Sequence, residues 1–434
     1  MRLRGRPLEG AVAAAQHNCQ EASHALVGPT GTIGAVGISR GTPMHDDTKL
    51  VHAGRRPEQF NGAVNPPVFH ASTILSATVE EWERKKADRA NDVPGTYYGR
   101  LGTPTTRVLE EALTALEGGY RTVLTPSGLA ACSVALLAYV DVGAHVLMVD
   151  NVYGPTRVFA ARFLERFGVE TTFYDPLVGR GIEALVRANT KVIYLESPGS
   201  LTFEVQDVPA IAAVAHRRGI TVIMDNTWAT PLYFKPLAHG VDASVQAATK
   251  YVVGHSDAML GAITVTEAAW PRLKSTHYQL GQCAGPDDVY LAQRGLRTMA
   301  VRLKRHWETS VQLAEYIARQ PEVECVRHPA LPGDPGHALW RRDFAGACGL
   351  FGVVMRTASK PAFAAFVDGL ELFGIGASWG GYESLIMPNS PEELRTATAW
   401  PHRGHCFRIH AGLEDPSDLI ADLAAGFGRL RAAL

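Results

Sequence analysis

Two short stretches of the chain decide its fold: residues 220–228, ITVIMDNTW, and residues 243–251, ASVQAATKY. Each stretch opens with an apolar or β-branched run and ends in polar residues, Asp225 in the first and Lys250 in the second. Such runs are typical of buried strands in a mostly parallel sheet. Ligands of these sheets bind at the carboxyl ends of the strands, where both polar groups are expected.

Similar runs alternate with helical patterns on both sides of these stretches. We expect further strands at 122–124, 145–149, 171–173, 191–195 and 262–265, and helices from 106 to the glycines at 118 and 119 and at 128–139, 155–167 and 207–216. This alternation predicts an α/β fold with a mostly parallel sheet flanked by helices. After residue 295 the pattern changes to a long helix at 295–319, strands at 349–355 and 406–410, and helices at 360–370 and 415–430. The second part therefore predicts a smaller C-terminal α+β domain.

The first 43 residues differ from the rest, because they are rich in Gly, Ala and Ser and show no helical or strand period. We interpret residues 1–43 as an unstructured leader. A transit peptide, suggested by Arg2, Arg4 and Arg6, and a start-site artefact remain alternatives, since Met44 directly precedes the first patterned segment.

Composition excludes several classes of protein. With 434 residues, 46% of them hydrophobic and 20% charged, the chain can bury a large core. A net charge of -1 without charged blocks argues against a nucleic-acid partner, and the apolar runs are too short to cross a membrane. Six scattered cysteines without a C-x-x-C pair favour a cytoplasmic location. His402, His405, Cys406 and His410 lie close in sequence, but no second cluster completes a metal site, so we expect none.

Lys250 and Asp225 together suggest a cofactor. Only nine lysines occur beside 33 arginines, so a lysine at a strand end is unusual in this chain. Considered alone, Lys250 is explained as a solvated turn residue and Asp225 as a helix cap. As a pair they meet the needs of pyridoxal 5'-phosphate (PLP), since a lysine forms the Schiff base and an aspartate keeps the pyridine nitrogen protonated.

A phosphate cradle is expected where the strand at 122–124 turns into the helix at 128–139. Ser127, Gly128 and Leu129 stand at this turn, and the free N–H groups of a helix start bind anions. Alone the signal is weak, because Ser127 is also an ordinary N-cap. Together with Asp225 and Lys250 it completes one cofactor site.

Several longer motifs resemble the transsulfuration family of PLP enzymes (Cys/Met metabolism, fold type I) from about residue 48 to the C-terminus. They are YYGR at 97–100 followed by GT at 102–103, LESPGS at 195–200, DNTW at 225–228, QAATKY at 246–251, GHSD at 254–257, SWGGYES at 378–384 and GLED at 412–415. The resemblance implies a PLP-dependent transferase fold of type I. It also implies an N-terminal arm at 44–102 that contributes to a neighbouring subunit's site, a PLP-binding domain at 103–296 and a small domain at 297–434.

The resemblance also implies roles for single residues. Lys250 holds PLP and Asp225 pairs with its ring nitrogen, while Tyr153 stacks on the ring and helps to deprotonate the incoming amine. The phosphate is bound by Ser127, Gly128, Leu129 and Thr249, joined by Tyr98 and Arg100 from a neighbouring subunit, within a homotetramer built as a dimer of dimers. The substrate is bound by Arg408, which grips the α-carboxylate as a bidentate guanidinium, and by Ser378 and Trp379.

The chain departs from the family at two positions. Ala247 stands where members often have a serine that binds the phosphate, which costs on the order of 1 kcal/mol. Ala377 stands where γ-enzymes tend to have glutamate and β-lyases tyrosine, and its lack of a carboxylate leans against γ chemistry.

The expected activity is β-elimination of the sulfur amino acid L-cystathionine to homocysteine, pyruvate and ammonia. γ-Lyase, γ-synthase or cysteine desulfhydrase activity on the same scaffold is the alternative, as is a noncatalytic relative that binds PLP and a partner protein. An NAD dehydrogenase would need a G-x-G-x-x-G turn, which residues 125–129 do not supply.

Overall fold

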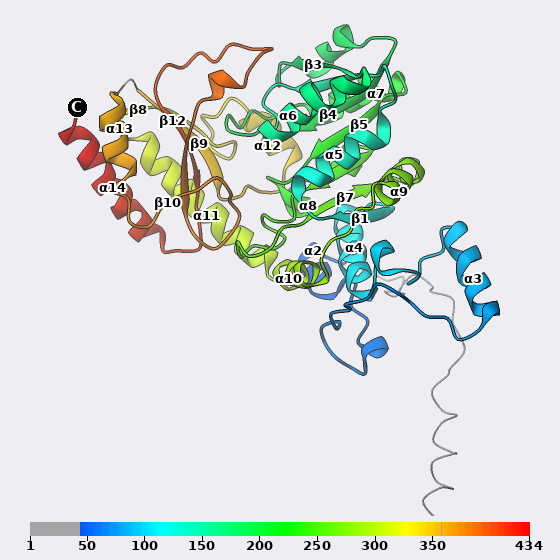
Figure 1. Cartoon of the computed structure of the whole chain (residues 1–434). Coiled ribbons are helices and arrows are strands. Elements are labelled where there is room, and N and C mark those ends of the chain that lie inside the picture. Colours follow the sequence, from blue (N-terminus) through cyan, green and yellow to red (C-terminus); the bar gives the residue numbers. More distant parts are fainter. Residues whose placement is uncertain (1–43, 357) are drawn as a thin grey trace, which may run out of the picture.

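The computed structural model describes residues 44–356 and 358–434, so the predicted leader lies outside the described residues. Two sheets organise these residues, and Figure 1 shows the smaller sheet beside the larger one. No helix among the described residues is long and apolar enough to cross a membrane.

The larger sheet has seven strands in the order β1-β7-β6-β5-β4-β2-β3. Only β7 runs antiparallel to its neighbours, which are β1 and β6. Its strands are β1 (Arg121–Thr125), β2 (His145–Val149), β3 (Glu170–Tyr174), β4 (Thr190–Glu196), β5 (Thr221–Asp225), β6 (Ala243–Gln246) and β7 (Gly261–Val265). Every residue of β2, β6 and β7 is buried, so both faces of the sheet are covered. The predicted mostly parallel α/β sheet is confirmed.

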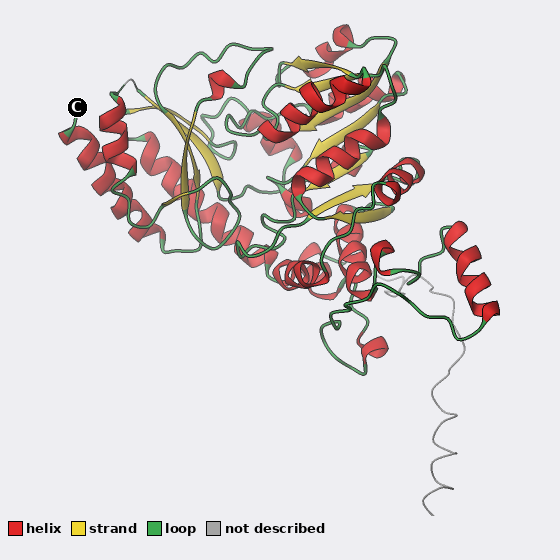
Figure 2. Ribbon diagram, viewed as in Figure 1, coloured by secondary structure: helices red, strands yellow, loops and turns green. Residues whose placement is uncertain are grey.

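Helices cover this sheet and precede it (Figure 2). Before the sheet come α2 (Asp46–His52), the 3-10 turn η1 (Pro57–Phe60), α3 (Val79–Ala90), the 3-10 turn η2 (Gly99–Leu101) and α4 (Pro104–Glu117). Between its strands come α5 (Gly128–Tyr139), α6 (Gly154–Val158), η3 (Phe159–Phe163), η4 (Leu164–Phe167), η5 (Gly179–Leu185), α7 (Val208–Arg217), α8 (Thr230–Tyr233) and η6 (Pro236–His239). After β7 come α9 (Trp270–Gln279) and α10 (Pro286–Arg297).

The smaller sheet has the order β10-β11-β12-β9-β8 and is antiparallel except between β10 and β11. Its strands are β8 (Val323–Arg327), β9 (Leu350–Met355), β10 (Gly374–Ile375), β11 (Leu385–Asn389) and β12 (Cys406–His410). The helical elements of this part are α11 (Met299–Ala318), α12 (His337–Asp343), α13 (Lys360–Val367), η7 (Pro391–Glu393) and α14 (Pro416–Ala432). The predicted smaller α+β part is confirmed.

Two hydrophobic cores correspond to the two sheets, and α11 takes part in both. Met299 and Leu303 pack in the core of the larger sheet, whereas Leu313 and Ile317 pack in the core of the smaller one. The proposed boundary between residues 296 and 297 falls at the end of α10, and α11 then carries the chain from one core to the other.

Two predicted helices differ in detail from the structure. The segment at 155–167 changes from α-helix to a π-helical turn and then to a 3-10 turn, and in it Phe159 stacks on Phe163 while Phe163 meets Phe167 at a tilt of 55°. The predicted helix at 295–319 is two helices that meet at Thr298. No Gly or Pro marks this break, and apolar residues continue on both sides of it, so the pattern reads as one helix.

Candidate active site

The carboxyl ends of several strands meet at one edge of the larger sheet. β2, β4, β5 and β6 run parallel. β1 runs in the same direction, because β7 is antiparallel to both β1 and β6. The predicted site segments follow these strand ends, so the topology brings together residues that are far apart in the sequence.

Asp225 closes β5 and is buried, with 8% of its surface exposed. The Thr227 hydroxyl and backbone N–H donate to Asp225 Oδ1 at 2.5 and 2.9 Å, and the Cys132 thiol donates to Oδ2 at 3.7 Å. Burial raises the pKa of Asp225, and the Thr227 bonds oppose this rise. The positive charge of Lys250 also opposes the rise, so a cationic group placed next to this buried carboxylate would be favoured.

Lys250 follows β6 and faces the smaller domain. Its Nζ donates to Ser378 Oγ at 2.7 Å and lies 5.3 Å from the centre of the Trp379 ring. Burial, with help from the positive charge of Arg408, lowers the pKa of Lys250 to about 8, although Asp225 acts in the opposite direction. The amine is therefore partly neutral near pH 7.5, which makes it both a nucleophile and a base.

A close backbone approach brings the Ser378–Trp379 segment to Lys250. Gly380 has a φ of +88°, and a Cβ at this position would lie 3.0 Å from the Lys250 backbone and Cβ. Glycine is the residue that tolerates both conditions. Ser378 itself is exposed and Trp379 is half-buried, so neither side chain is fully enclosed by the protein.

The start of α5 forms the predicted phosphate cradle. Ser127 Oγ accepts the N–H of Ala130 at 3.1 Å, and the first N–H groups of the helix, at Gly128 and Leu129, have no acceptor within it. A Cβ on Gly128 would lie 2.5 Å from the Ala247 Cβ, so this helix start packs directly on the segment that leads to Lys250.

Among the predicted phosphate ligands, Thr249 has a hydroxyl that is already hydrogen-bonded within the protein. Its hydroxyl donates to Leu260 O at 3.1 Å and accepts the Leu260 N–H at 2.9 Å. The single hydroxyl proton is thus already used within the protein. Phosphate binding by Thr249 would need this pair of bonds to rearrange.

Tyr153 and Arg408 come from different sheets, because Tyr153 follows β2 and Arg408 belongs to the smaller sheet. Tyr153 is 44% exposed, and its backbone N–H donates to Glu196 Oε2 at 2.7 Å. Arg408, on β12, is 8% exposed and donates from Nη2 to the carbonyls of Ala377 at 2.5 Å and Ser378 at 3.3 Å. Burial lowers the pKa of Arg408 to about 10, so its guanidinium stays charged at neutral pH. Ala377 therefore contributes its carbonyl, rather than a side chain, to the placement of Arg408.

Tyr98 and Arg100 lie in the N-terminal part, where Tyr98 precedes η2 and Arg100 belongs to it. Tyr98 is 41% exposed, and Arg100 is exposed and donates to Tyr278 O at 3.1 Å. Neither side chain is bonded to the residues around Lys250. Within one chain these two residues do not complete the site.

Sequence reasoning missed three side chains around Asp225. Thr227 links the two strand ends, because its Oγ accepts the Ala247 N–H at 2.8 Å. Cys132 comes from α5, and Glu196 is the register partner of Asp225 at the end of β4. Thr227 and Glu196 stand inside the motifs at 225–228 and 195–200, so their polar character at strand ends was the available signal. Nothing in the local pattern marks Cys132.

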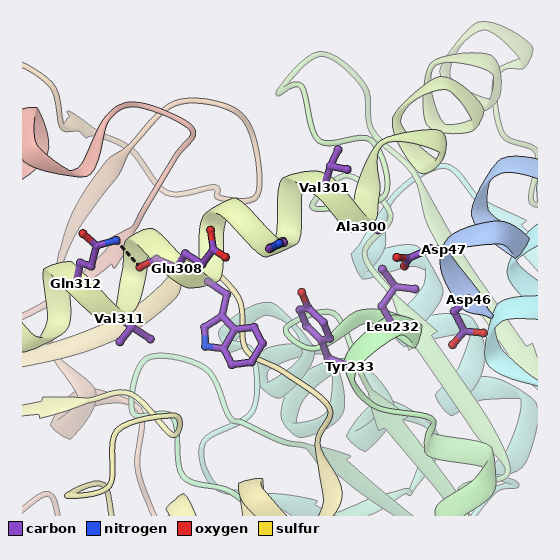
Figure 3. A pocket seen from close by; sticks show the side chains of 11 residues that line it. Asp46, Asp47, Leu232, Tyr233, Ala300, Val301, Glu308, Val311 and Gln312 are labelled. Atoms are coloured by element: carbon purple, nitrogen blue, oxygen red, sulfur yellow. Dashed lines mark hydrogen bonds between the residues drawn. The ribbon is translucent and has the colours of Figure 1, made fainter.

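A cavity of about 730 Å³ lies apart from these residues (Figure 3). It is lined mainly by apolar side chains of α8 and α11, with Asp46 and Asp47 of α2 at its margin. None of the predicted cofactor or substrate residues lines it. This cavity is therefore not the candidate active site.

The described residues fit pyridoxal phosphate and offer no alternative metal site. Asp225 is a buried carboxylate in need of a cation, Lys250 is an amine with a lowered pKa, and α5 presents free N–H groups close to both. These are the three kinds of partner that the ring nitrogen, aldehyde and phosphate require. Between residues 44 and 434, with 357 left aside, no group of three or more His, Cys, Asp or Glu side chains is placed to hold a metal ion.

The chain is similar to curated proteins over nearly its whole length. It is 44% identical over 390 residues to cystathionine beta-lyase MetC of Escherichia coli strain K12, covering 88% of this chain and 98% of the relative. It is 41% identical over 396 residues to L-alanine/L-glutamate racemase of Wolbachia pipientis wMel, covering 89% of this chain and 98% of that relative. Both matches leave out about a tenth of the chain.

A solved structure and a family model agree with these relatives. Cystathionine gamma synthase from Xanthomonas oryzae pv. oryzae superposes with a TM-score of 0.82 at 31% identity, covering 91% of this chain and all of that one. Residues 47–428 match the model of the Cys/Met metabolism PLP-dependent enzymes. The fold, the strand-end site and the cofactor fit lead to one conclusion: this chain belongs to the Cys/Met metabolism family and is a PLP-dependent enzyme.

Proposed function

We propose that this protein is a cystathionine beta-lyase, a carbon–sulfur lyase of methionine biosynthesis. It converts L-cystathionine and water to homocysteine, pyruvate and ammonia. The observation that carries the proposal is the proximity of Lys250 both to Asp225 at the strand edge and to Arg408 of β12. The 44% identity to the E. coli beta-lyase and the absence of a carboxylate at Ala377 support β rather than γ chemistry.

Each residue of the site has one proposed task. Arg408 binds the substrate α-carboxylate, for which a guanidinium is the geometric match. Ser378 and Trp379 form the wall beside the substrate, and Asp225 holds a proton at the ring nitrogen. The start of α5 (Ser127, Gly128 and Leu129) binds the phosphate, and Thr249 takes part only after its bonds to Leu260 rearrange.

Lys250 and Tyr153 carry the protons. When bound, PLP supplies an electrophilic carbon for the amine and a ring that accepts the negative charge of the substrate Cα. Tyr153 accepts a proton from the incoming substrate amine. Lys250, with its pKa lowered to about 8, then removes the Cα proton. As the Cβ–S bond breaks, its electron pair leaves on sulfur, and Lys250 or Tyr153 protonates the departing thiolate.

Replacement of Lys250 tests this assignment directly. Lys250→Ala is expected to abolish formation of pyruvate from L-cystathionine in an assay coupled to lactate dehydrogenase, because the base is removed. Lys304→Ala is the control, since Lys304 lies on α11 at the separate cavity. Full activity of Lys250→Ala would overturn the mechanism.

A second candidate activity is racemisation of small amino acids. The relative from Wolbachia named as a racemase is almost as similar as the E. coli lyase. A racemase must return the Cα proton on either face, and the site offers Lys250 and Tyr153 as separate proton carriers. Incubation with L-alanine and chiral chromatography for D-alanine tests this candidate, and absence of D-alanine rejects it.

We also propose that the protein acts as a homotetramer in the cytoplasm, with sites completed by Tyr98 and Arg100 of a neighbouring subunit. In Figure 1 helix α3 projects away from the rest of the chain, and it has no buried residue. Val79 and Trp82 of α3 are 74% and 59% exposed, and apolar side chains of this size favour a second chain over water. The scattered cysteines of the sequence support the cytoplasmic location.

A further inference from the structure

The connection between β11 and β12, residues 390–405, extends far beyond a hairpin turn. β11 and β12 are antiparallel neighbours, and Met387 pairs with Arg408 in their ladder. Such strands need only about two to five residues to join them. Figure 1 shows this connection, in orange, leaving the smaller sheet and reaching the larger sheet near β3 and α6.

Asp150 receives the connection at the larger sheet. It follows β2 directly, and its side chain is fully buried. Three consecutive backbone N–H groups donate to its carboxylate: Thr396 at 2.9 Å, Ala397 at 2.9 Å and Thr398 at 3.0 Å. Burial would raise the pKa of Asp150, but these N–H groups and Arg157 outweigh burial and lower it. The carboxylate is therefore charged at neutral pH.

Arginine side chains complete the attachment from both sides. Arg157, on α6, donates to Asp150 Oδ1 at 3.1 Å and also bonds the Thr396 hydroxyl. Arg395, on the connection, is 7% exposed and donates to Glu204 at 2.8 Å. Two arginines thus balance two carboxylates in a buried cluster, so no charge is left without a partner.

The strand end that holds the connection also leads to Tyr153, three residues after Asp150. The neighbouring Asn151 donates to Glu204 Oε2 at 2.9 Å, so the connection acts on two successive residues of this turn. Tyr153 itself is 44% exposed and depends on its backbone for its position. The same connection leads directly into β12, which carries Arg408.

We propose that Asp150 is a positioning residue: it clasps the β11–β12 connection and thereby fixes Tyr153 of the larger domain relative to Arg408 of the smaller one. We call the contacts of Asp150 with residues 396–398 the clasp. Through the clasp, the position of Tyr153 depends on the position of Arg408. This inference rests on the proposed role of Tyr153 and adds a residue that does not touch substrate.

A double-mutant cycle tests the positioning role with the PLP-loaded enzyme and L-cystathionine. Asp150→Asn keeps the shape but replaces one acceptor oxygen by an NH₂ group, and kcat/KM is expected to fall roughly tenfold to a hundredfold. In a Tyr153→Phe background the same change is expected to cost less than about twofold, because there is no phenol left to position. If Tyr153→Phe lowers kcat/KM and Asp150→Asn still lowers it tenfold to a hundredfold in that background, the positioning role of Asp150 is overturned, whereas the role of Tyr153 stands. A Tyr153→Phe enzyme with unchanged kcat/KM overturns the role of Tyr153 and the clasp with it.

Hydrogen exchange supplies a readout that does not depend on activity. In Asp150→Asn the amides of 396–398 are expected to exchange faster, since their shared acceptor is weakened. Asp415→Asn is the matched control, because Asp415 accepts the Ser417 N–H at 2.9 Å at the start of α14 and should leave 396–398 unchanged. Arg395→Gln attacks the clasp from the other side and is expected to act in the same direction if Asp150→Asn folds poorly. Unchanged exchange at 396–398 in both clasp variants contradicts the proposal.

Discussion

Lys250 owes its chemistry to its surroundings. The fold places its amine beside Arg408 and away from water, and these two conditions lower its pKa to about 8. An ordinary lysine is almost fully protonated at neutral pH and reacts slowly as a nucleophile. Asp225 limits the shift, so the amine remains able to take up a proton as well as to release one.

The pKa of Lys250 predicts how the cofactor-free protein takes up PLP. Only the neutral amine attacks an aldehyde, so the rate constant of uptake is expected to rise with pH and to level off above about 8. Stopped-flow absorbance after mixing the protein with PLP at a series of pH values measures this rate. A rate that keeps rising toward pH 10 would mean that the lysine titrates as it does in water.

Arg408 should determine how well substrate binds. Arg408→Gln leaves a substrate carboxylate without its charged partner, which costs about 2–4 kcal/mol, or roughly thirtyfold to a thousandfold in kcat/KM. Steady-state kinetics with L-cystathionine measure the effect. Arg356→Gln is the control, since Arg356 is an exposed residue just beyond β9. Similar kcat/KM values for the two variants would remove Arg408 from the site.

Among the elements, α5 has a proposed function beyond its part in the core. Ser127→Ala removes the cap of α5, which costs about 1 kcal/mol, so the affinity for PLP is expected to fall roughly fivefold. Ser359→Ala removes an equivalent cap from α13 in the smaller domain and is expected to leave PLP affinity unchanged. Fluorescence titration of the cofactor-free variants compares the two. Equal affinities would show that Ser127 does not contribute to phosphate binding.

Helices and strands could be predicted from the sequence where a local pattern of apolar residues marks them. The strands at 145–149 and 406–410 and the helix at 128–139 were predicted with the bounds that the structure has, because continuous apolar runs mark them. The short strand β10 was missed, since its two residues are both exposed. The break at Thr298 was missed because neither glycine nor proline stands at 297–299 to mark the end of α10.

Single residues of the candidate site could be predicted from the sequence, but the hydrogen bonds that join its segments could not. Lys250 and Asp225 stand out as polar residues after apolar strands. The bond from Arg408 to the Ala377 carbonyl joins two residues of the smaller part that are 31 positions apart, and the convergence of 396–398 on Asp150 joins the smaller part to the larger sheet. Contacts between segments that are separated in the sequence leave no trace in local periodicity.

The whole molecule is expected to form sites that two chains share. A mixed oligomer of Lys250→Ala and Arg100→Ala chains contains one doubly altered site and one unaltered site for each pair of chains. Each parent is therefore expected to be impaired, while the mixed species, isolated through two different affinity tags, recovers about half of the wild-type activity per pair. If the mixed species is no more active than its parents, each site is made by a single chain.

The proposed enzyme is defined by the bond that it breaks, which is the Cβ–S bond of L-cystathionine. The most direct measurement is mass spectrometry of the products formed from L-cystathionine by the purified, PLP-loaded enzyme. Cleavage at the Cβ–S bond predicts pyruvate and homocysteine in equal amounts. Formation of 2-oxobutyrate and cysteine would contradict the account, because γ-elimination would then proceed at a site with Ala377 in place of a carboxylate.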